Sequence, residues 1–209
     1  ITGSGGVAGY RLTKDPLQRV LATCDDSLKG KRDRALLPFA WASGGRRRSE
    51  VAGADMKFLK RLGPGEFSYN LSYSKTNQTA VDRPENHKPV VGVAGAALQE
   101  WLSASRIREG ALFRRVLKGG HLGAPLSAAA VRDVVRARCL LAGMEGEFSA
   151  HSLRAGFVTE AAAQNIPLGH TMALTGHRSL SAVMGYHRHK DAVRLDGDLL
   201  AEPSTNPAR

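Results

Sequence analysis

The stretch FSAHSLRAGFVTEAAAQNIPLGHTMALTGHRSLSAVMGYHRHKDA, residues 148–192, contains five of the chain's seven histidines and one of its four tyrosines. His151 and Arg154 are three residues apart in a predicted helix, so they share one face. His177 follows 23 residues after Arg154, and Tyr186 follows nine residues after His177. Breaks at NIPLGH and TGHRS divide the stretch into two or three helices. A metal site, a solvated basic face and a phosphate-cutting site are all open interpretations of this set.

The composition of the whole chain favours a polyanionic partner. Its 209 residues, 42% of them hydrophobic, suffice for one sizeable core or two small ones. The net charge is +11, which favours phosphate contacts and counterion release. Cys24 and Cys139 form no metal-type pair and are typical of structural thiols in a reduced, intracellular protein. No apolar run reaches the length of a membrane span.

Hydrophobic periodicity predicts a mostly helical α+β domain with one small sheet. Apolar residues at helical spacing predict helices in residues 13–26, 31–43, 94–105 and 126–143. The last of these has Ser127 as N-cap and Gly143 at its end. A short helix is expected within residues 44–55.

The sheet is predicted where the period of the hydrophobic pattern changes. Residues 55–93 contain two β-type stretches around the turn GPG, and KPVVGV is expected to form a third antiparallel strand. Residues 112–127 indicate a short hairpin or an ordered loop. Neither an internal repeat nor a second-domain boundary is visible.

The residues of the opening stretch resemble the catalytic domain of the tyrosine recombinases, the phage integrase family. That family carries an H-x-x-R pair, then a histidine or tryptophan in a GH-type turn, then a tyrosine at these separations. LTGHRSLSAVMGYHR is also similar to the family's sequence around the last two positions. The resemblance covers about Lys14–Lys190. It implies the tyrosine recombinase catalytic fold, with a small three-stranded antiparallel sheet.

The resemblance also demands an upstream arginine and a hairpin lysine. The arginine is sought in ASGGRRRSEVAGAD, where the family's R-x-S-E pattern fits Arg47 with Glu50 as its orienting partner. Because three arginines stand in a row, the choice between Arg46 and Arg47 stays open. The lysine is expected on a β-hairpin, and YSKTNQT places Lys75 at a strand-to-turn junction.

The roles implied for these residues follow from the chemistry of a phosphodiester. Arg47 and Arg154 would clamp the non-bridging oxygens and neutralise charge without a metal. His177 would donate a hydrogen bond to a phosphate oxygen. Tyr186 would be the nucleophile, and His151 its general base.

Lys75 would act as general acid for the leaving 5′ oxygen. The resulting intermediate is a 3′-phosphotyrosyl link with a free 5′ hydroxyl. It stores the energy of the broken bond, so no ATP motif is needed. The residues expected to contact DNA are Arg46, Arg48, His187, Arg188 and Lys190.

A metal centre is the main alternative for the histidines. His170, His177, His187 and His189 lack the spacings of known zinc motifs, and Arg188 lies between the last two. We therefore expect no metal and no other cofactor.

The expected function is site-specific recombination of double-stranded DNA. The alternatives are a type IB topoisomerase, which uses the same residues to relax supercoils, and a non-catalytic DNA-binding regulator of the same fold. As implied by the resemblance, the full-length protein would form a tetramer on DNA, and the free fragment a monomer. Its location would be the cytoplasm, where a bacterial, phage or mobile-element protein acts on chromosomal DNA.

Three segments are expected along the chain. Residues 1–13 would be a linker from an N-terminal core-binding domain absent from this sequence. Residues 14–190 would be the catalytic domain, and residues 191–209 a C-terminal tail.

Overall fold

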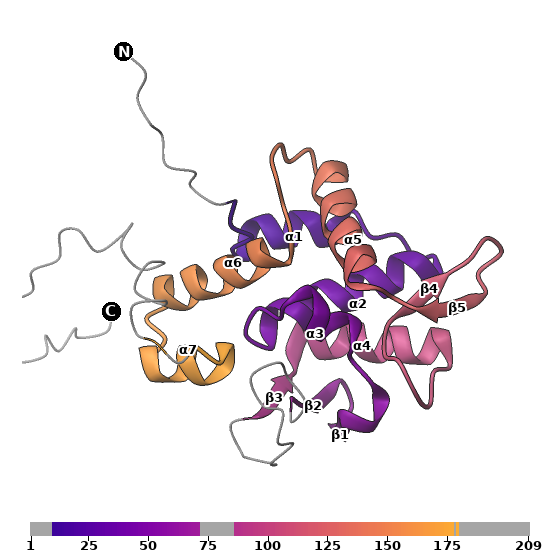
Figure 1. Ribbon diagram of the computed structural model, residues 1–209, viewed down its shortest axis with the longest axis horizontal. Coiled ribbons are helices and arrows are strands. Elements are labelled where there is room, and N and C mark those ends of the chain that lie inside the picture. Colours follow the sequence, from indigo (N-terminus) through magenta and orange to yellow (C-terminus); the bar gives the residue numbers. More distant parts are fainter. Residues whose placement is uncertain (1–9, 72–85, 178, 180–209) are drawn as a thin grey trace, which may run out of the picture.

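The computed structural model describes residues 10–71, 86–177 and 179 (Figure 1). Its helices and strands, in chain order, are α1 (Lys14–Ala22), α2 (Leu28–Ala42), α3 (Arg48–Ala52), η1 (Met56–Phe58), β1 (Leu59–Gly63), β2 (Glu66–Asn70), β3 (His87–Val90), α4 (Gly92–Ser105), β4 (Arg114–Val116), β5 (Leu122–Pro125), α5 (Ala128–Leu141), α6 (Ala150–Ala163) and α7 (Leu168–Thr175). Within these residues no helix is both long enough and apolar enough to cross a membrane.

The core is built around α2, which packs along α4. Phe39 on α2 is fully buried and meets the rings of Tyr69 and Phe113 edge-on, at centroid distances of 5.1 and 5.4 Å. Trp101 on α4 is also fully buried, and its indole N–H donates to the carbonyl of Leu112 at 2.9 Å. Burial of these large rings, with the indole donor satisfied, is what makes this the centre of the domain.

The three-stranded antiparallel sheet is confirmed, with the order β1-β2-β3. Along β2, Phe67 and Tyr69 are buried, whereas Glu66, Ser68 and Asn70 are not, which is the alternation expected of a strand with one covered face. The first strand begins at Leu59, because Asp55 instead caps the 3₁₀ helix η1 by accepting from the Lys57 amide at 3.0 Å. The predicted hairpin at residues 112–127 is also present, as β4 and β5.

A buried ionic network joins α1, α2 and α5. Asp33 is 1% exposed, and its carboxylate accepts from the guanidinium groups of Arg32 and Arg138. Arg138 also donates to the carbonyl of Thr23, just after α1, at 2.6 Å. A buried carboxylate is stable only when its oxygens are paired in this way, so the network fixes these three helices relative to one another.

Helix α6 is held close to the segment before α1. The Leu12 amide donates to the carbonyl of Ser152 at 2.9 Å, and the Trp41 indole donates to the carbonyl of Leu12 at 2.8 Å. Gly156 permits this approach, because a β-carbon there would lie 1.9 Å from the Leu12 carbonyl oxygen. These contacts bring the start of α6 next to the loop between α2 and α3.

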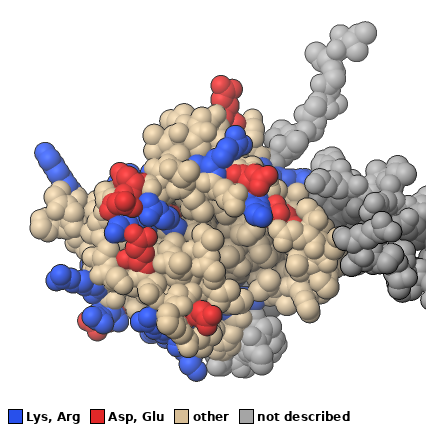
Figure 2. Space-filling view, turned by 180° about the vertical axis from the view of Figure 1, so that it is seen from behind, with Lys and Arg blue, Asp and Glu red and all other residues tan. Residues whose placement is uncertain are grey.

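The net charge of +11 is not spread evenly over the surface. On the face shown in Figure 2, acidic side chains lie among the basic ones, and a wide area carries no charge. This face is therefore not a uniformly basic surface.

Candidate active site

His151 and Arg154 enter the site from the first turns of α6. Ser149 caps this helix, and its hydroxyl accepts from the His151 amide at 3.2 Å. Ser152 completes the cap by accepting from the Ser149 amide at 3.1 Å. The exposed His151 ring and the largely buried Arg154 side chain thus project from consecutive turns of one capped helix end.

Arg154 is held by main-chain carbonyls from the loop after α2 and from the last residue of α7. Its guanidinium donates to Gly45 at 3.1 Å and to Thr175 at 2.8 Å. Gly45 has φ +67°, and a β-carbon there would lie 2.3 Å from the Arg154 Cα. Only glycine fits both the backbone conformation and the space, so the GG turn is what allows α6 to approach the arginine run.

The three consecutive arginines differ in how deeply their side chains are buried. Arg46 is 4% exposed, and its guanidinium donates to the carbonyl of Leu174 at 2.6 Å. The Arg47 side chain is 50% exposed and lines the pocket, as does the exposed Arg48. This geometry favours Arg47 over Arg46 as the arginine that reaches a substrate. The expected DNA contact by Arg46 does not fit its burial, because its guanidinium is turned into the protein.

Glu50 lies between the first two arginines. Its carboxylate accepts from the Arg47 amide at 2.9 Å and lies 3.7 Å from the Arg47 guanidinium and 3.9 Å from that of Arg46. Burial lowers the pKa of Arg46 to about 10, and the charges of Arg154 and Arg47 act in the same direction, against the opposing effect of Glu50. Arg46 is still cationic at neutral pH, so Glu50 faces two positive side chains.

His177 follows the C-terminal end of α7. Gly176 ends the helix in the left-handed conformation, and the Nδ1 atom of His177 lies 2.7 Å from the Thr175 hydroxyl. That hydroxyl already donates to the Thr171 carbonyl at 2.8 Å, so the hydrogen-bond geometry assigns the proton of a neutral ring to Nδ1. In this tautomer Nε2 is an acceptor, and donation from Nε2 to a phosphate requires the ring to gain a proton.

The pKa of His177 is lowered to about 4 by burial and by the charges of Arg154, Arg47 and Arg46. The ring is therefore neutral at pH 7. The negative charge of a bound phosphate would offset the arginine charges and raise the pKa of His177. The ring would then gain a proton at Nε2, which could donate a hydrogen bond to the phosphate.

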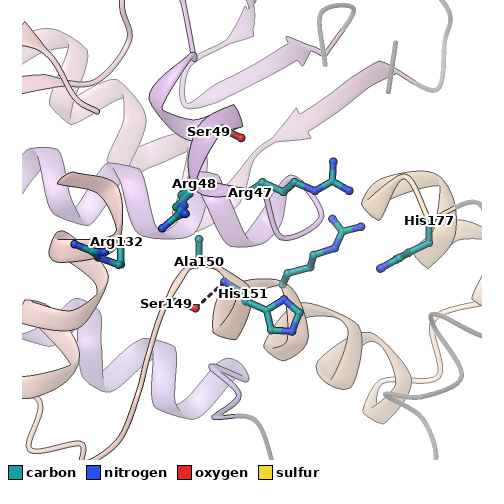
Figure 3. Close-up of a pocket in the computed structure, with 9 residues that line it drawn as sticks. Arg47, Arg48, Ser49, Arg132, Ser149, Ala150, His151 and His177 are labelled. Atoms are coloured by element: carbon teal, nitrogen blue, oxygen red, sulfur yellow. Dashed lines mark hydrogen bonds between the residues drawn. The ribbon is translucent and has the colours of Figure 1, made fainter. Parts of the chain in front are cut away.

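Arg47, His151, Arg154 and His177 line one pocket of about 520 Å³ (Figure 3). Arg47 and His177 extend into it from opposite sides, with His151 below them in the view, while Arg48 and Arg132 lie at the other end. The residues that line the pocket are Arg47, Arg48, Ser49, Arg132, Ser149, Ala150, His151, Arg154 and His177. This lining set includes four arginines and no carboxylate, so the pocket is suited to an anion.

Arg132 on α5 is the pocket residue that the sequence did not indicate. It is partly exposed and also pairs with Asp133 at 2.9 Å. No motif marks it, since it reaches the pocket only through the packing of α5 beside α3.

Several of the predicted site residues lie outside the described residues. These are Lys75, Tyr186, His187, Arg188 and Lys190. His170, from the metal alternative, is described, whereas His189 is not. In the described part of the chain, no three His, Cys, Asp or Glu side chains gather as a metal site would require.

The lowered pKa of His177 predicts a pH-dependent stability. The ordinary histidine pKa of 6.5 applies to the unfolded chain and a pKa of about 4 to the folded one, so the unfolded state binds more protons between these values. The free energy of unfolding that depends on a neutral His177 is fully present above pH 6.5 and is lost as the pH falls toward 4. Urea unfolding between these pH values should show a smaller loss of stability in His177→Gln than in the wild type. Equal losses in the two proteins would contradict the assignment.

Comparison with known proteins places this geometry in a family. The Phage integrase family profile matches residues 10–192. An integrase/recombinase xerD homolog from Selenomonas ruminantium is 31% identical over 169 residues, which are 78% of this chain and 48% of the relative. The chain therefore spans about half the length of that relative.

Solved structures share the fold at low sequence identity. The XerH site-specific recombinase bound to palindromic difH substrate superposes with a TM-score of 0.67 at 20% identity, over 97% of this chain and 56% of that one. A lambda integrase dimer bound to a COC′ core site gives 0.57 at 18% identity, over 93% of this chain and 64% of the other. These likenesses show the fold, and the profile match over residues 10–192 shows that the chain belongs to the phage integrase family.

Proposed function

We propose that the protein is a site-specific DNA recombinase that cuts and rejoins strands through a 3′-phosphotyrosyl intermediate. The observation that carries the proposal is the convergence of Arg47, His151, Arg154 and His177 on one pocket without a carboxylate in its lining. These four side chains come from three separate parts of the chain, and they are the types that a phosphoryl transfer without a metal requires.

Binding of the scissile phosphate would use the two arginines that reach the pocket. The Arg47 side chain is half exposed and held by Glu50, while Arg154 is fixed by two carbonyls. Such fixed guanidinium groups bind phosphate oxygens bidentately and stabilise the negative charge of the transition state. Arg48 and Arg132 line the same pocket and would contact neighbouring phosphates.

The chemical step would begin with the phenol of Tyr186. Its oxygen attacks phosphorus while His151 takes the phenolic proton, and the bond from phosphorus to the 5′ oxygen breaks. Lys75 gives a proton to that leaving oxygen. The products are a 3′-phosphotyrosyl bond and a free 5′ hydroxyl, and the reverse sequence on a new 5′ hydroxyl rejoins the strand.

The role of Lys75 can be tested with a modified leaving group. A 5′-bridging phosphorothiolate leaves as a thiolate that needs little protonation. Lys75→Ala should therefore slow cleavage of ordinary DNA far more than cleavage of the phosphorothiolate, as measured in single-turnover reactions. Equal slowing on both substrates would reduce Lys75 to a phosphate contact.

We further propose that the full-length protein assembles as a tetramer on double-stranded DNA and that the free fragment is a monomer. Support comes from an apolar pocket of about 470 Å³, bordered by α1, α2, α6 and the start of α4. Val93 at its rim is 71% exposed and Ile166 is 39% exposed. A short apolar segment such as that of residues 191–209 in a neighbouring protomer would cover this surface. DNA as the substrate would also place the protein in the cytoplasm with the chromosome.

The proposal is tested by capturing covalent adducts in excess EDTA from a pool of nicked duplexes of random sequence. Recovered sequences are then supplied in pairs and assayed for strand exchange. We expect adducts enriched in one sequence, strand exchange between two copies of it, and no loss of either with EDTA. Adducts without sequence preference, together with relaxation of supercoils, would indicate a type IB topoisomerase. The absence of any adduct would indicate a regulator that only binds DNA, and loss of adducts in EDTA would restore the metal alternative.

A further inference from the structure

The last turn of α7 is held by three cations from three different parts of the chain. Lys88 on β3 donates to the carbonyl of Ala173. The carbonyl of Leu174 accepts from Arg46 at 2.6 Å, and that of Thr175 accepts from Arg154 at 2.8 Å. Three successive carbonyls of one helix end are thus each paired with a different buried positive charge.

This arrangement matches the electrostatics of a helix C-terminus. The last carbonyls of a helix have no partner within the helix, and they carry the negative end of its dipole. Lys88, Arg46 and Arg154 are 5%, 4% and 8% exposed, so each has left most of its hydration. A buried cation is stable only with strong acceptors, and the carbonyls of α7 supply them.

Helix α7 has little else to fix it in the described part of the chain. Its eight residues include only two buried ones, Thr171 and Thr175, and neither is a large apolar side chain. Figure 1 shows the helix at the edge of the domain, beside α6. Its position therefore depends on the bonds to its carbonyls rather than on apolar packing.

We propose that Arg46 and Lys88 are positioning residues that hold the C-terminal end of α7 and thereby place His177 in the pocket. His177 follows Thr175 by two residues, with only the left-handed Gly176 between them. Arg46, Lys88 and Arg154 together form a clamp on the carbonyls of α7. Because Arg154 also lines the pocket, a shift of these carbonyls would release its guanidinium as well. The effect of these residues on cleavage rests on the proposed function, whereas their effect on α7 does not.

The clamp is tested first in the DNA-free protein, with Arg46→Met and Lys88→Met. Both variants remove the donors and keep an unbranched apolar side chain. Lys60→Met is the control for Lys88, since Lys60 is an exposed lysine on β1 of the same sheet. Arg19→Met is the control for Arg46, since Arg19 is an exposed arginine on α1.

Amide hydrogen exchange at Gly176, which donates to the Met172 carbonyl at 2.8 Å, reports on the end of α7. In each clamp variant we expect exchange there to rise by about tenfold or more, the size expected from losing a hydrogen bond to a charged group. Amides of the core helix α2 should keep their protection, and the controls should match the wild type. An unchanged exchange rate at Gly176 would overturn the proposal. An equal rise of the exchange rates in α2 and α7 would also overturn it, because it marks only a loss of global stability.

The pKa of His177, followed by NMR, gives a second reading. Burial is the largest cause of its low value, so a ring released from the pocket should titrate closer to 6.5 than to 4. Lys88→Met should show this rise, and Lys60→Met should not. Arg46→Met removes a positive charge that itself lowers this pKa, so Lys88→Met is the deciding variant. A His177 pKa that stays near 4 in Lys88→Met would contradict the positioning role. Neither measurement requires cleavage, so the proposal can fail or hold independently of the recombinase activity.

Discussion

Tyr186→Phe should abolish formation of the covalent protein–DNA adduct while leaving DNA binding nearly unchanged. Phenylalanine keeps the ring and removes only the oxygen that would attack phosphorus. Binding depends mainly on arginine and lysine contacts to phosphates, which this substitution leaves in place. Adducts stable in SDS and equilibrium binding, measured on the same nicked duplex, give the two quantities.

Tyr10→Phe is the matched control for this substitution. Tyr10 packs against Phe148 with the rings tilted at 47° and their centroids 5.1 Å apart, and it is 44% exposed. Losing its hydroxyl should change neither adduct formation nor binding. A Tyr186→Phe protein that still forms the adduct would show that another residue is the nucleophile.

Arg47→Ala should lower the single-turnover cleavage rate by about 10²–10³-fold, the typical effect of removing one donor to a transition-state oxygen. The half-exposed guanidinium of Arg47, on the same pocket as Arg154, is the reason for this expectation. Because the substrate phosphate gains negative charge in the transition state, the loss should be larger in rate than in affinity.

Arg48→Ala is the matched comparison, since Arg48 is the adjacent arginine and also lines the pocket. Because Arg48 would contact a neighbouring phosphate, its removal should weaken binding to all DNA sequences. The slope of the logarithm of the binding constant against the logarithm of the salt concentration should fall in magnitude by about one. The cleavage rate of Arg48→Ala at saturating DNA should stay near that of the wild type. Reversed effects of the two substitutions would mean that the catalytic arginine had been assigned one position too early.

Much of the fold was accessible from the sequence because it depends on local patterns. The cap at Ser127 and the apolar spacing of α5 predicted that helix, and the Ser127 hydroxyl accepts from the Ala130 amide at 3.1 Å. The change to a period of two predicted the sheet within residues 55–93. The first few residues were wrong, because the Asp55 side chain favours a 3₁₀ turn over an extended start. The last three were also wrong, because β3 ends at Val90 and α4 begins at Gly92.

The candidate site was accessible only in part. The motif placed His151, Arg154 and His177, and the structure brings all three to one pocket. Sequence spacing could not decide which arginine of the run is catalytic, because the three side chains are identical. They differ only in that the GG turn directs one of them into the protein. Arg132 could not be found either, because its place in the pocket depends on how α5 packs.

The cation clamp on α7 shows the same limit. Arg46 and Lys88 are 42 residues apart in sequence, and their bonds go to main-chain carbonyls, which leave no trace in side-chain identity. The predicted roles of Lys75, Tyr186, His187, Arg188 and Lys190 stay predictions, since these residues lie beyond the described part of the chain.

Peptide mapping of the captured adduct tests the central claim most directly. The adduct is digested with protease and nuclease, and the modified peptide is sequenced by mass spectrometry. We predict a nucleotide joined through its 3′ phosphate to Tyr186, with a free 5′ hydroxyl on the released strand. Attachment at another residue, or a 5′-phosphate link, would contradict the proposed mechanism.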